Sequence, residues 1–192
     1  MSQRYPARIT RLPMLALFEA RGSEAGLLAA LVASGLNLPP AAKSVAGQPT
    51  RPAVLRLGPR RVLIMGEARE EAALGEALDG AFAKVPGADF ALVSDMFAAF
   101  DLSGKGCADI LAQGSALDLS EAAMPAGSAT GTELWGAAVI IIRSEGPQPG
   151  FRIIVDRSHA GFIEDWLTVA SGGTSALRPG VMIAPPRSWK PS

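Results

Sequence analysis

The side chains able to perform acid–base or nucleophilic chemistry are few, and one group of them falls in a single short stretch. His159, the only histidine of the chain, follows Ser158 directly and lies three residues after Asp156. These are the residue types of a serine–histidine–acid triad, but a triad depends on geometry, and adjacent residues near a helix start point in different directions. The chain also lacks the G-x-S-x-G turn that exposes a nucleophile. The sequence therefore favours a surface or capping role for His159.

Three carboxylates, Asp95, Asp101 and Glu133, lie nearest to the ends of expected strands. A carboxylate held near a reacting amine could orient the amine and stabilise developing positive charge. Each of the three has the right chemistry for that role. Turns and solvent-facing strand ends favour the same residue type, and this interpretation is the better supported one. We therefore assign no catalytic residue.

No metal-binding or cofactor-binding motif is complete. One cysteine and one histidine are too few for a structural zinc site. The segment 104–106 (G-K-G) lacks the upstream glycine and the hydroxyl residue of a phosphate-binding loop. The glycine-rich segment 127–132 precedes a strand, whereas a dinucleotide fingerprint follows one, so we expect a plain loop there. Cys107 cannot form an intrachain disulfide, and we expect it to be a small buried apolar residue.

The elements that would position these groups are clearest between residues 89 and 119. Apolar residues alternate with others on both sides of Ser94 and Asp95, which predicts two short strands joined by a tight turn. Ser103 has the side chain of a helix N-cap, and Gly114 is typical of a helix end. The stretch therefore predicts a hairpin followed by a helix.

The same unit is expected at two further places. Strands 53–57 and 61–65 flank a Gly-Pro turn and precede a helix over 67–85, while strands 134–143 and 151–155 precede a helix capped by Ser158. The fold class is therefore α+β, with repeated hairpin-plus-helix units that form a two-layer sandwich. We predict one domain with three parts. Residues 1–52 form a strand, a helix capped by Ser23 and a Pro/Gly-rich loop, residues 53–170 form the core, and residues 171–192 form an irregular tail.

The 192-residue chain has a formal net charge of zero, which argues against a nucleic-acid partner or a membrane-surface role driven by bulk charge. Its charges are unevenly spread, at +7 over residues 1–66 and −9 over residues 67–135. The two segments either face each other within the fold or form a polarised surface that orients partners. Without a recognisable signal peptide or membrane span, the expected location is the cytoplasm.

Three stretches resemble the gamma subunit of heterotetrameric sarcosine oxidase, in order and together over about half of the chain. The best match includes D-L-S-G-K-G-C-A-D-I-L-A-Q-G-S-A-L-D-L. The family usually has acidic residues and a tryptophan where this chain has Arg60, Arg61 and Val62, and often a histidine where it has Ser120. The matching stretches are residues 53–66, 93–119 and 151–167.

The resemblance implies a fold related to the folate-binding domain of the glycine-cleavage T-protein, an aminomethyltransferase, and a non-catalytic role. In such a complex the alpha, beta and delta subunits are the partners. They carry FAD, FMN, NAD, tetrahydrofolate and zinc, and none of these is expected on this chain. The complex would oxidise sarcosine or a related N-methyl amine and pass the one-carbon unit to tetrahydrofolate. The alternative is a stand-alone folate-binding aminomethyltransferase-like enzyme.

If the chain docks on an alpha subunit, its exposed arginines and its tail tryptophan are the expected contacts. Arg60 and Arg61 follow the Gly-Pro turn, and Arg157 precedes the last expected helix. Trp189 lies in a Pro-rich segment that is hard to bury within the fold, and exposed tryptophans are common interface anchors. The predicted interface residues are therefore Arg60, Arg61, Arg157 and Trp189.

Overall fold

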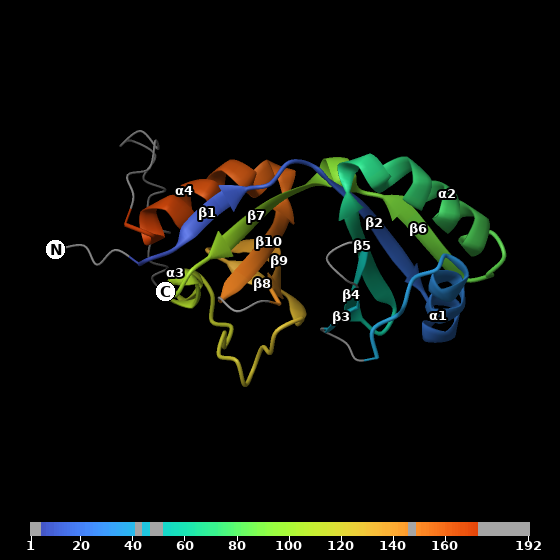
Figure 1. The fold of residues 1–192 in the computed structure, drawn as a ribbon, viewed down its shortest axis with the longest axis horizontal. Helices are drawn as coiled ribbons and strands as arrows, with labels where there is room; N and C mark the ends of the chain where they lie inside the picture. The colour runs from blue at the N-terminus through green and yellow to red at the C-terminus, as the bar shows by residue number, and fades with distance from the viewer. Residues whose placement is uncertain (1–4, 41–43, 47–51, 146–148, 173–192) are drawn as a thin grey trace, which may run out of the picture.

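The chain forms two five-stranded antiparallel sheets, each covered by two helices (Figure 1). The computed structural model describes residues 5–40, 44–46, 52–145 and 149–172. The strands are β1 (Arg8–Arg11), β2 (Leu15–Gly22), β3 (Ser44–Ala46), β4 (Ala53–Gly58), β5 (Arg61–Glu67), β6 (Ala88–Leu92), β7 (Phe97–Ser103), β8 (Ala129–Leu134), β9 (Ala137–Arg143) and β10 (Gly150–Asp156). The helices are α1 (Glu24–Ala33), α2 (Glu71–Phe82), α3 (Cys107–Ala112) and α4 (Ala160–Ala170), with 3₁₀ turns η1 (Ala68–Glu70), η2 (Ser94–Met96) and η3 (Arg157–His159).

The two sheets have the same topology. One has the strand order β3-β4-β5-β2-β6 and the other the order β8-β9-β10-β7-β1. We call the first sheet with α1 and α2 the N-lobe, and the second sheet with α3 and α4 the C-lobe. Each lobe runs strand, helix, three strands and helix, and its fifth strand pairs beside the first. In the N-lobe that fifth strand is β6, whereas in the C-lobe it is β1, so the chain starts in the C-lobe, builds the N-lobe and returns.

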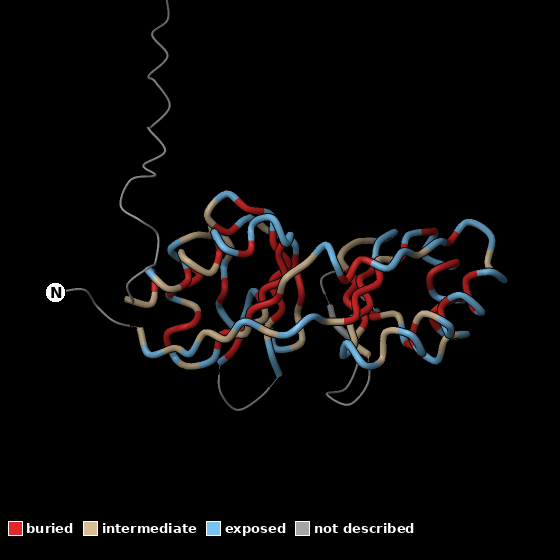
Figure 2. The backbone as a smooth tube through the Cα atoms, turned by 90° about the horizontal axis from the view of Figure 1, so that it is seen from above, coloured by how far each residue is buried: buried red, intermediate tan, exposed pale blue. Residues whose placement is uncertain are grey.

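The layers stack as helices, sheet, sheet and helices, with the buried strands of both sheets at the centre (Figure 2). One apolar cluster fills the space between the N-lobe sheet and its helices, and a second does the same in the C-lobe. A third cluster joins the inner faces of the two sheets. Its buried members are Leu17, Leu55, Leu63, Val93, Ala99, Ala129, Ile140, Ile142 and Ile154.

The run Val139–Ile142 shows why the core takes this form. In β9, Ile141 contributes to the C-lobe cluster while Ile140 and Ile142 contribute to the cluster between the sheets. Successive side chains of a strand point to opposite faces, so a strand that is apolar at every position must be covered on both. The sequence thus requires a second layer on the inner face of this sheet.

The predicted hairpin within residues 89–114 is wrong, although both strands form. β6 pairs with β2 in the N-lobe, and β7 pairs with β1 and β10 in the C-lobe, with η2 between them. Phe90 packs with the rings of Phe18 and Phe82 in the N-lobe, whereas Phe100 belongs to the C-lobe cluster. Because each strand packs in a different core, the two strands do not pair with each other.

Two smaller expectations also fail. α3 begins at Cys107 after Gly106, so Ser103 is not its N-cap, and Gly104 takes a positive φ of 119° that makes an additional turn. Part of the segment expected as a loop, 127–132, is instead the edge strand β8. The sequence analysis did not predict β1.

The α+β class is confirmed, and so are the hairpin-plus-helix units β4-β5-α2 and β9-β10-α4. Ser23 caps α1 as expected, because its side chain accepts a hydrogen bond from the amide of Gly26 at 3.1 Å. Each lobe has the two layers that the sequence predicts, and the two lobes pack sheet to sheet. Residues 173–192 of the expected tail, with Trp189, lie outside the described residues.

Candidate functional site

The chain crosses between the lobes twice, once between β1 and β2 and once between β6 and β7. A backbone hydrogen bond joins each crossing segment to a strand next to the other crossing. The amide of Leu12 donates to the carbonyl of Ala99 at 2.9 Å, and the amide of Val93 donates to the carbonyl of Leu17 at 2.8 Å. Ser94 is buried and donates its hydroxyl to Glu71 Oε2 at 2.6 Å, while it accepts from the amide of Leu17 at 3.0 Å. These hydrogen bonds hold the two crossing segments in place, so the crossover is a well-defined part of the surface.

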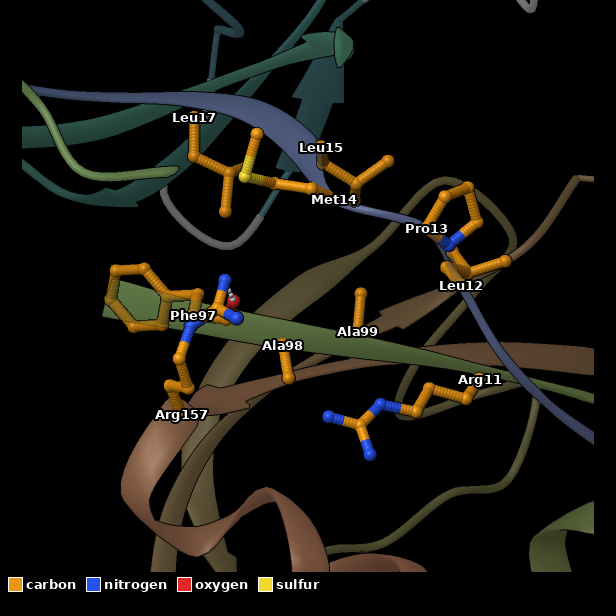
Figure 3. Close-up of a pocket in the computed structure, with 10 residues that line it drawn as sticks. All are labelled: Arg11, Leu12, Pro13, Met14, Leu15, Leu17, Phe97, Ala98, Ala99 and Arg157. Carbon is orange, nitrogen blue, oxygen red and sulfur yellow. Dashed lines mark hydrogen bonds between the residues drawn. The ribbon is translucent and has the colours of Figure 1, made fainter. Parts of the chain in front are cut away.

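A groove of about 100 Å³ lies at this crossover (Figure 3). Most of its lining side chains are apolar, and one of them, Met14, leaves 47% of its surface exposed. Binding pockets for small molecules have volumes of roughly 300–1,000 Å³, so this groove is too small to enclose a folate or a flavin. A single side chain from another protein would fit it. The lining residues are Arg11, Leu12, Pro13, Met14, Leu15, Leu17, Phe97, Ala98, Ala99 and Arg157.

Of the predicted interface residues, Arg157 is the one that lines this groove. Its Nε donates to the carbonyl of Asp95 at 2.6 Å and its Nη2 donates to that of Phe97 at 3.2 Å. These acceptors are neutral carbonyls, so the hydrogen bonds orient the guanidinium without cancelling its charge. Arg11, on the other rim, instead pairs with Glu164 at 2.9 Å.

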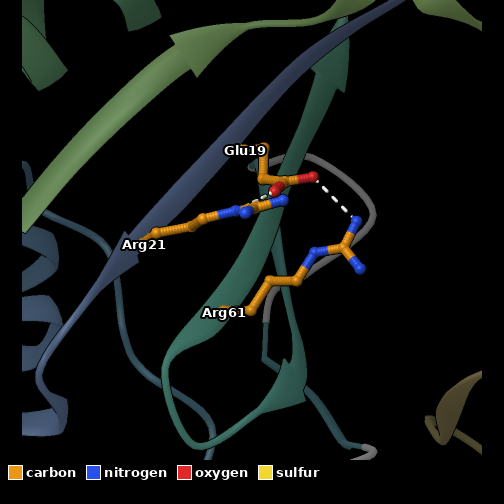
Figure 4. Close-up of polar contacts among 3 residues, drawn as sticks. All are labelled: Glu19, Arg21 and Arg61. Atoms are coloured by element: carbon orange, nitrogen blue, oxygen red, sulfur yellow. Dashed lines mark hydrogen bonds and ion pairs between the residues drawn. The ribbon is translucent and has the colours of Figure 1, made fainter.

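Arg60 and Arg61 lie at the β4–β5 turn, at the opposite end of the N-lobe sheet. Arg61 is the register partner of Arg21, near the end of β2, whereas the groove-lining Leu15 begins that strand. Arg21 and Arg61 both bind Glu19, and Arg61 Nη2 lies 2.8 Å from Glu19 Oε2 (Figure 4). Burial alone would raise the pKa of Glu19, but the hydrogen bonds and charges of Arg61 and Arg21 lower it overall. The structure thus divides the predicted interface arginines between two separate places.

Asp101 is bound by an arginine within the fold. Arg152 Nε donates to Asp101 Oδ1 at 2.7 Å and Nη2 donates to Oδ2 at 2.9 Å, which is a bidentate ion pair. The hydrogen bonds that Arg152 donates to Asp101 raise the pKa of Arg152. Arg152 Nη1 also lies 3.7 Å from the sulfur of Met65 in the other sheet. This carboxylate therefore stabilises the contact between the lobes.

Asp95 and Glu133 do not join Asp101 in one site. Asp95 lies in η2, while Glu133 is exposed on β8, three strands away from β7 in the sheet. Adjacent strands are about 4.8 Å apart, so Asp101 and Glu133 are separated by roughly 14 Å across the sheet. The three carboxylates cannot act on one reacting group.

Ser158, His159 and Asp156 form a capping arrangement at the start of α4. Asp156 Oδ1 accepts from the Ser158 amide at 2.8 Å and from its hydroxyl at 2.6 Å, and these hydrogen bonds lower the pKa of Asp156. Asp156 is therefore the N-cap of η3, the 3₁₀ turn that leads into α4, and the expected capping of α4 by Ser158 is wrong, because its N-cap position is His159. The Ser158 hydroxyl lies 3.3 Å from His159 Nδ1 but is directed at the carboxylate. All three side chains are exposed.

Cys107 is fully buried as expected, and burial raises the pKa of its thiol to about 11. The described part of the chain holds no group of three or more His, Cys, Asp or Glu side chains that could bind a metal ion. It also contains no helix that is long and apolar enough to span a membrane.

Sequence reasoning did not find the groove. Its residues come from β1, β2, β7 and η3 together with the β1–β2 link, and they share no motif. In the sequence, Pro13 interrupts the apolar run from Leu12 to Phe18. The exposed methionine beside the proline is the one signal that could have indicated a surface contact.

The fold with two such lobes is shared with known proteins. The chain superposes on the glycine-cleavage aminomethyltransferase T of Bartonella henselae with a TM-score of 0.66 and 16% identity, over 85% of this chain and 46% of that one. It also matches the aspartate kinase regulatory subunit of Thermus thermophilus with a TM-score of 0.50 and 14% identity, over 85% of this chain and 97% of that one. At such identities these matches define the class of fold alone, that of the aminomethyltransferase type.

A closer match defines the family. The heterotetrameric sarcosine oxidase of Corynebacterium sp. U-96, solved with pyrrole 2-carboxylate, contains a chain that superposes with a TM-score of 0.80. It is 26% identical over 89% of this chain and 86% of that one. Residues 21–173 match the family described as sarcosine oxidase, gamma subunit, and the chain belongs to this family. The search of curated protein sequences gives no match. The chain is therefore a gamma subunit of a sarcosine oxidase-type complex and has partner subunits.

Proposed function

We propose that this gamma subunit has a structural rather than a catalytic role, and that it docks on the alpha subunit of its complex. The observation that carries the proposal is the bidentate ion pair between Asp101 and Arg152. A carboxylate that acts on a bound amine needs free lone pairs directed at that amine. Both oxygens of Asp101 instead accept hydrogen bonds from a residue of the neighbouring strand. The chain thus has the aminomethyltransferase type of fold, with the carboxylate of Asp101 used for packing.

Docking through the crossover groove is the part of the proposal that the structure supports best. The groove combines mostly apolar lining side chains with the oriented guanidinium of Arg157, and arginine is enriched at protein interfaces. Arg60 and Arg61 would then form a second contact at the far end of the N-lobe. Trp189 is the remaining proposed contact.

The chemistry of the complex is proposed from its family. It would oxidise the C–N bond of sarcosine or a related N-methyl amine in the cytoplasm and pass the one-carbon unit to tetrahydrofolate. FAD, FMN, NAD, tetrahydrofolate and zinc would be held by the alpha, beta and delta subunits.

Assembly with and without this chain tests the structural role. All four subunits are co-expressed, and the native mass, flavin content and turnover per flavin are measured. Arg157→Gln should weaken incorporation of this chain by about tenfold, as expected when a charge at an interface rim is lost. Arg69→Gln is the matched control, because Arg69 is 80% exposed and pairs only with the nearby Glu67 among the ion pairs of the described residues.

The alternative enzyme is tested by the carboxylates. Asp95→Asn and Glu133→Gln should leave turnover per flavin within twofold of the unmodified complex, since no catalytic step depends on them. The isolated chain should show no turnover of an aminomethyl donor with tetrahydrofolate. Turnover by the lone chain, or loss of activity in fully assembled variants, would overturn the structural role.

A further inference from the structure

Three polar or charged residues are buried among those that the structure describes, and Ser94 is the one that lies at the crossover; the others are Arg56 and Thr130. Ser94 is 2% exposed and begins η2, where the chain passes from the N-lobe to the C-lobe. Burying a hydroxyl costs free energy unless it forms hydrogen bonds. The hydrogen-bond partners of Ser94 therefore indicate what a polar residue does at this place.

The hydroxyl of Ser94 connects the second crossing segment to two elements of the N-lobe. It donates to Glu71 Oε2 at 2.6 Å, and it accepts from the amide of Leu17 at 3.0 Å. Glu71 is the first residue of α2, and Leu17 lies in β2. A hydrogen bond to a carboxylate is roughly twice as strong as one between neutral groups. The start of η2 is therefore anchored to the N-lobe by a side chain.

The residues directly after Ser94 hold the guanidinium of Arg157. Its Nε donates to the carbonyl of Asp95 at 2.6 Å, and its Nη2 donates to the carbonyl of Phe97 at 3.2 Å (Figure 3). Phe97 pairs with Asp156 of β10, so the C-lobe sheet fixes its position. Asp95 lies in η2, outside both sheets. The position of its carbonyl therefore depends more on the anchor at Ser94.

Ser94 also joins the two walls of the crossover groove, although it is not one of the residues that line it. Leu17 of the N-lobe and Phe97 of the C-lobe are both lining residues. Ser94 binds the amide of Leu17 and lies three residues before Phe97 in the chain. Both residues also take part in the apolar cluster between the sheets. That cluster holds the sheets together, whereas the hydrogen bonds of Ser94 set the path of the chain that leads to the groove.

We infer that Ser94 and Glu71 are positioning residues of the proposed docking surface. The carboxylate of Glu71 holds the hydroxyl of Ser94, the hydroxyl fixes η2, and the Asp95 carbonyl in η2 orients the guanidinium of Arg157. A side chain that is already oriented loses less conformational entropy when a partner binds. The inference rests on the proposed docking through the crossover groove. It makes docking depend on α2 of the N-lobe, although Arg157 belongs to the C-lobe.

The test measures how much of this chain is incorporated when the four subunits are co-expressed. Glu71→Ala removes the acceptor of the Ser94 hydroxyl and should weaken incorporation by about threefold, an effect expected within one hydrogen-bond network. Glu71→Gln removes the charge but retains an oxygen that accepts from the hydroxyl, so it should recover most of the lost incorporation. Glu76→Ala is the matched control, because Glu76 is exposed on the same helix, and it should have no effect.

A double-mutant cycle separates positioning from a general loss of structure. In an Arg157→Gln background, Glu71→Ala should cause no further loss of incorporation, because Glu71 acts through the guanidinium. The same loss in both backgrounds, or undiminished incorporation of a folded Glu71→Ala chain, overturns the inference. Thermal unfolding of each variant shows whether it is folded. Normal incorporation of Arg157→Gln is a different result, which refutes docking through the groove instead.

Nuclear magnetic resonance of the full chain gives a measurement that does not depend on docking. The Nε–H signal of Arg157 is assigned by its loss in Arg157→Gln. Glu71→Ala and Ser94→Ala should each speed its exchange with solvent by at least about threefold, because the hydrogen bond to the Asp95 carbonyl opens more often. Glu76→Ala should leave the exchange rate unchanged. Unchanged exchange in the folded Glu71 and Ser94 variants overturns the inference even where docking through the groove is confirmed.

Discussion

The two lobes have the same strand order and an equivalent ion pair, whose arginine is less exposed in the C-lobe than in the N-lobe although its carboxylate is more exposed. In each lobe the first strand carries an acidic residue on its inner face, and the strand before the second helix carries the arginine that binds it. In the C-lobe this pair is Asp101 and Arg152, which reaches Met65 of the other sheet. In the N-lobe it is Glu19 and Arg61, at the β4–β5 turn, where the arginine is 46% exposed. One arrangement therefore stabilises the contact between lobes, and the other shapes a surface.

The helices of the two lobes also differ in the side chains that they expose. α1 occupies the place in the N-lobe that α3 has in the C-lobe, and α2 the place that α4 has. α1 leaves Leu28 and Val32 exposed, whereas α4 exposes the aromatic side chains of Phe162 and Trp166. The shared topology accounts for the two cores, while the exposed side chains distinguish the lobes as surfaces. Fold and docking are thus specified by different residues of the same elements.

The largest expected effect concerns the contact that both lobes share. Ile154 and Leu63 lie in the cluster between the sheets, one from each lobe, and both are at most 1% exposed. Ile154→Ala and Leu63→Ala should each lower the free energy of unfolding by about 3 kcal/mol, because each leaves a cavity in the same layer. Denaturant titration followed by circular dichroism and by tryptophan fluorescence measures both.

The positions of the tryptophans allow the fluorescence and circular dichroism signals to distinguish the two lobes. Both tryptophans within the described residues, Trp135 and Trp166, lie in the C-lobe, so in a Trp189→Phe background fluorescence reports that lobe while circular dichroism reports both. Coincident transitions are expected if the shared cluster makes the lobes unfold together. Two separate transitions would show that the lobes are independent and would contradict the shared role of the cluster.

A smaller effect separates the two equivalent ion pairs. Asp101→Asn leaves Arg152 without its charged partner at the contact between lobes, and should lower the free energy of unfolding by about 1–2 kcal/mol. Glu19→Gln should cost less than about 1 kcal/mol, since Arg21 and Arg61 are exposed enough to be hydrated. Urea titration of both variants decides the order. Equal losses in the free energy of unfolding would show that the exposure of the arginine does not distinguish the two pairs. A double-mutant cycle with Arg152→Gln isolates the C-lobe interaction.

Local patterns in the sequence were sufficient for most elements of both lobes. The apolar run Val139–Ile142 predicted a central strand, and Ser23 predicted the start of α1, because each depends on neighbours within a few residues. β1 and β8 are edge strands with short, weakly alternating sequences, so their pairing depends on partners that lie far along the chain. Such strands carry little signal of their own.

The crossover could not be predicted from local sequence patterns. The alternation on both sides of Ser94 is the same whether the two strands form a hairpin or join different sheets. What decides between them is the packing of Phe90 in the N-lobe and of Phe100 in the C-lobe. The candidate site depends on that crossover, so sequence patterns predict Arg157 as a contact but cannot place it in a groove or separate it from Arg60 and Arg61.

The pH dependence of stability sharpens the comparison between the ion pairs further. The pKa of Glu19 is lowered in the folded state, so its ionised form stabilises the fold at pH values above its ordinary pKa of 4.5. That contribution should be lost as the pH falls from about 4.5 through the lowered value, because the proton then binds the unfolded state more tightly. Urea titrations of the unmodified chain and of Glu19→Gln between pH 3 and 7 measure it. The difference between the two proteins should shrink as the pH falls, and a constant difference would contradict the role of Glu19.

The smallest expected effect tests whether the outer face of α1 belongs to the fold at all. Val32 is 59% exposed, and Glu24 is the one charged residue of α1. The outer face of this helix therefore contributes little to the stability of the fold. Val32→Lys should change the free energy of unfolding by less than about 0.5 kcal/mol, since lysine has the better helix propensity and exposed sites tolerate substitution. The solubility of the isolated chain should rise. Val32→Ala is the control, because it shortens the side chain without adding charge. A loss of 1 kcal/mol or more would show that α1 is packed as its counterpart α3 is, and that the two lobes do not differ in the way their exposed surfaces indicate.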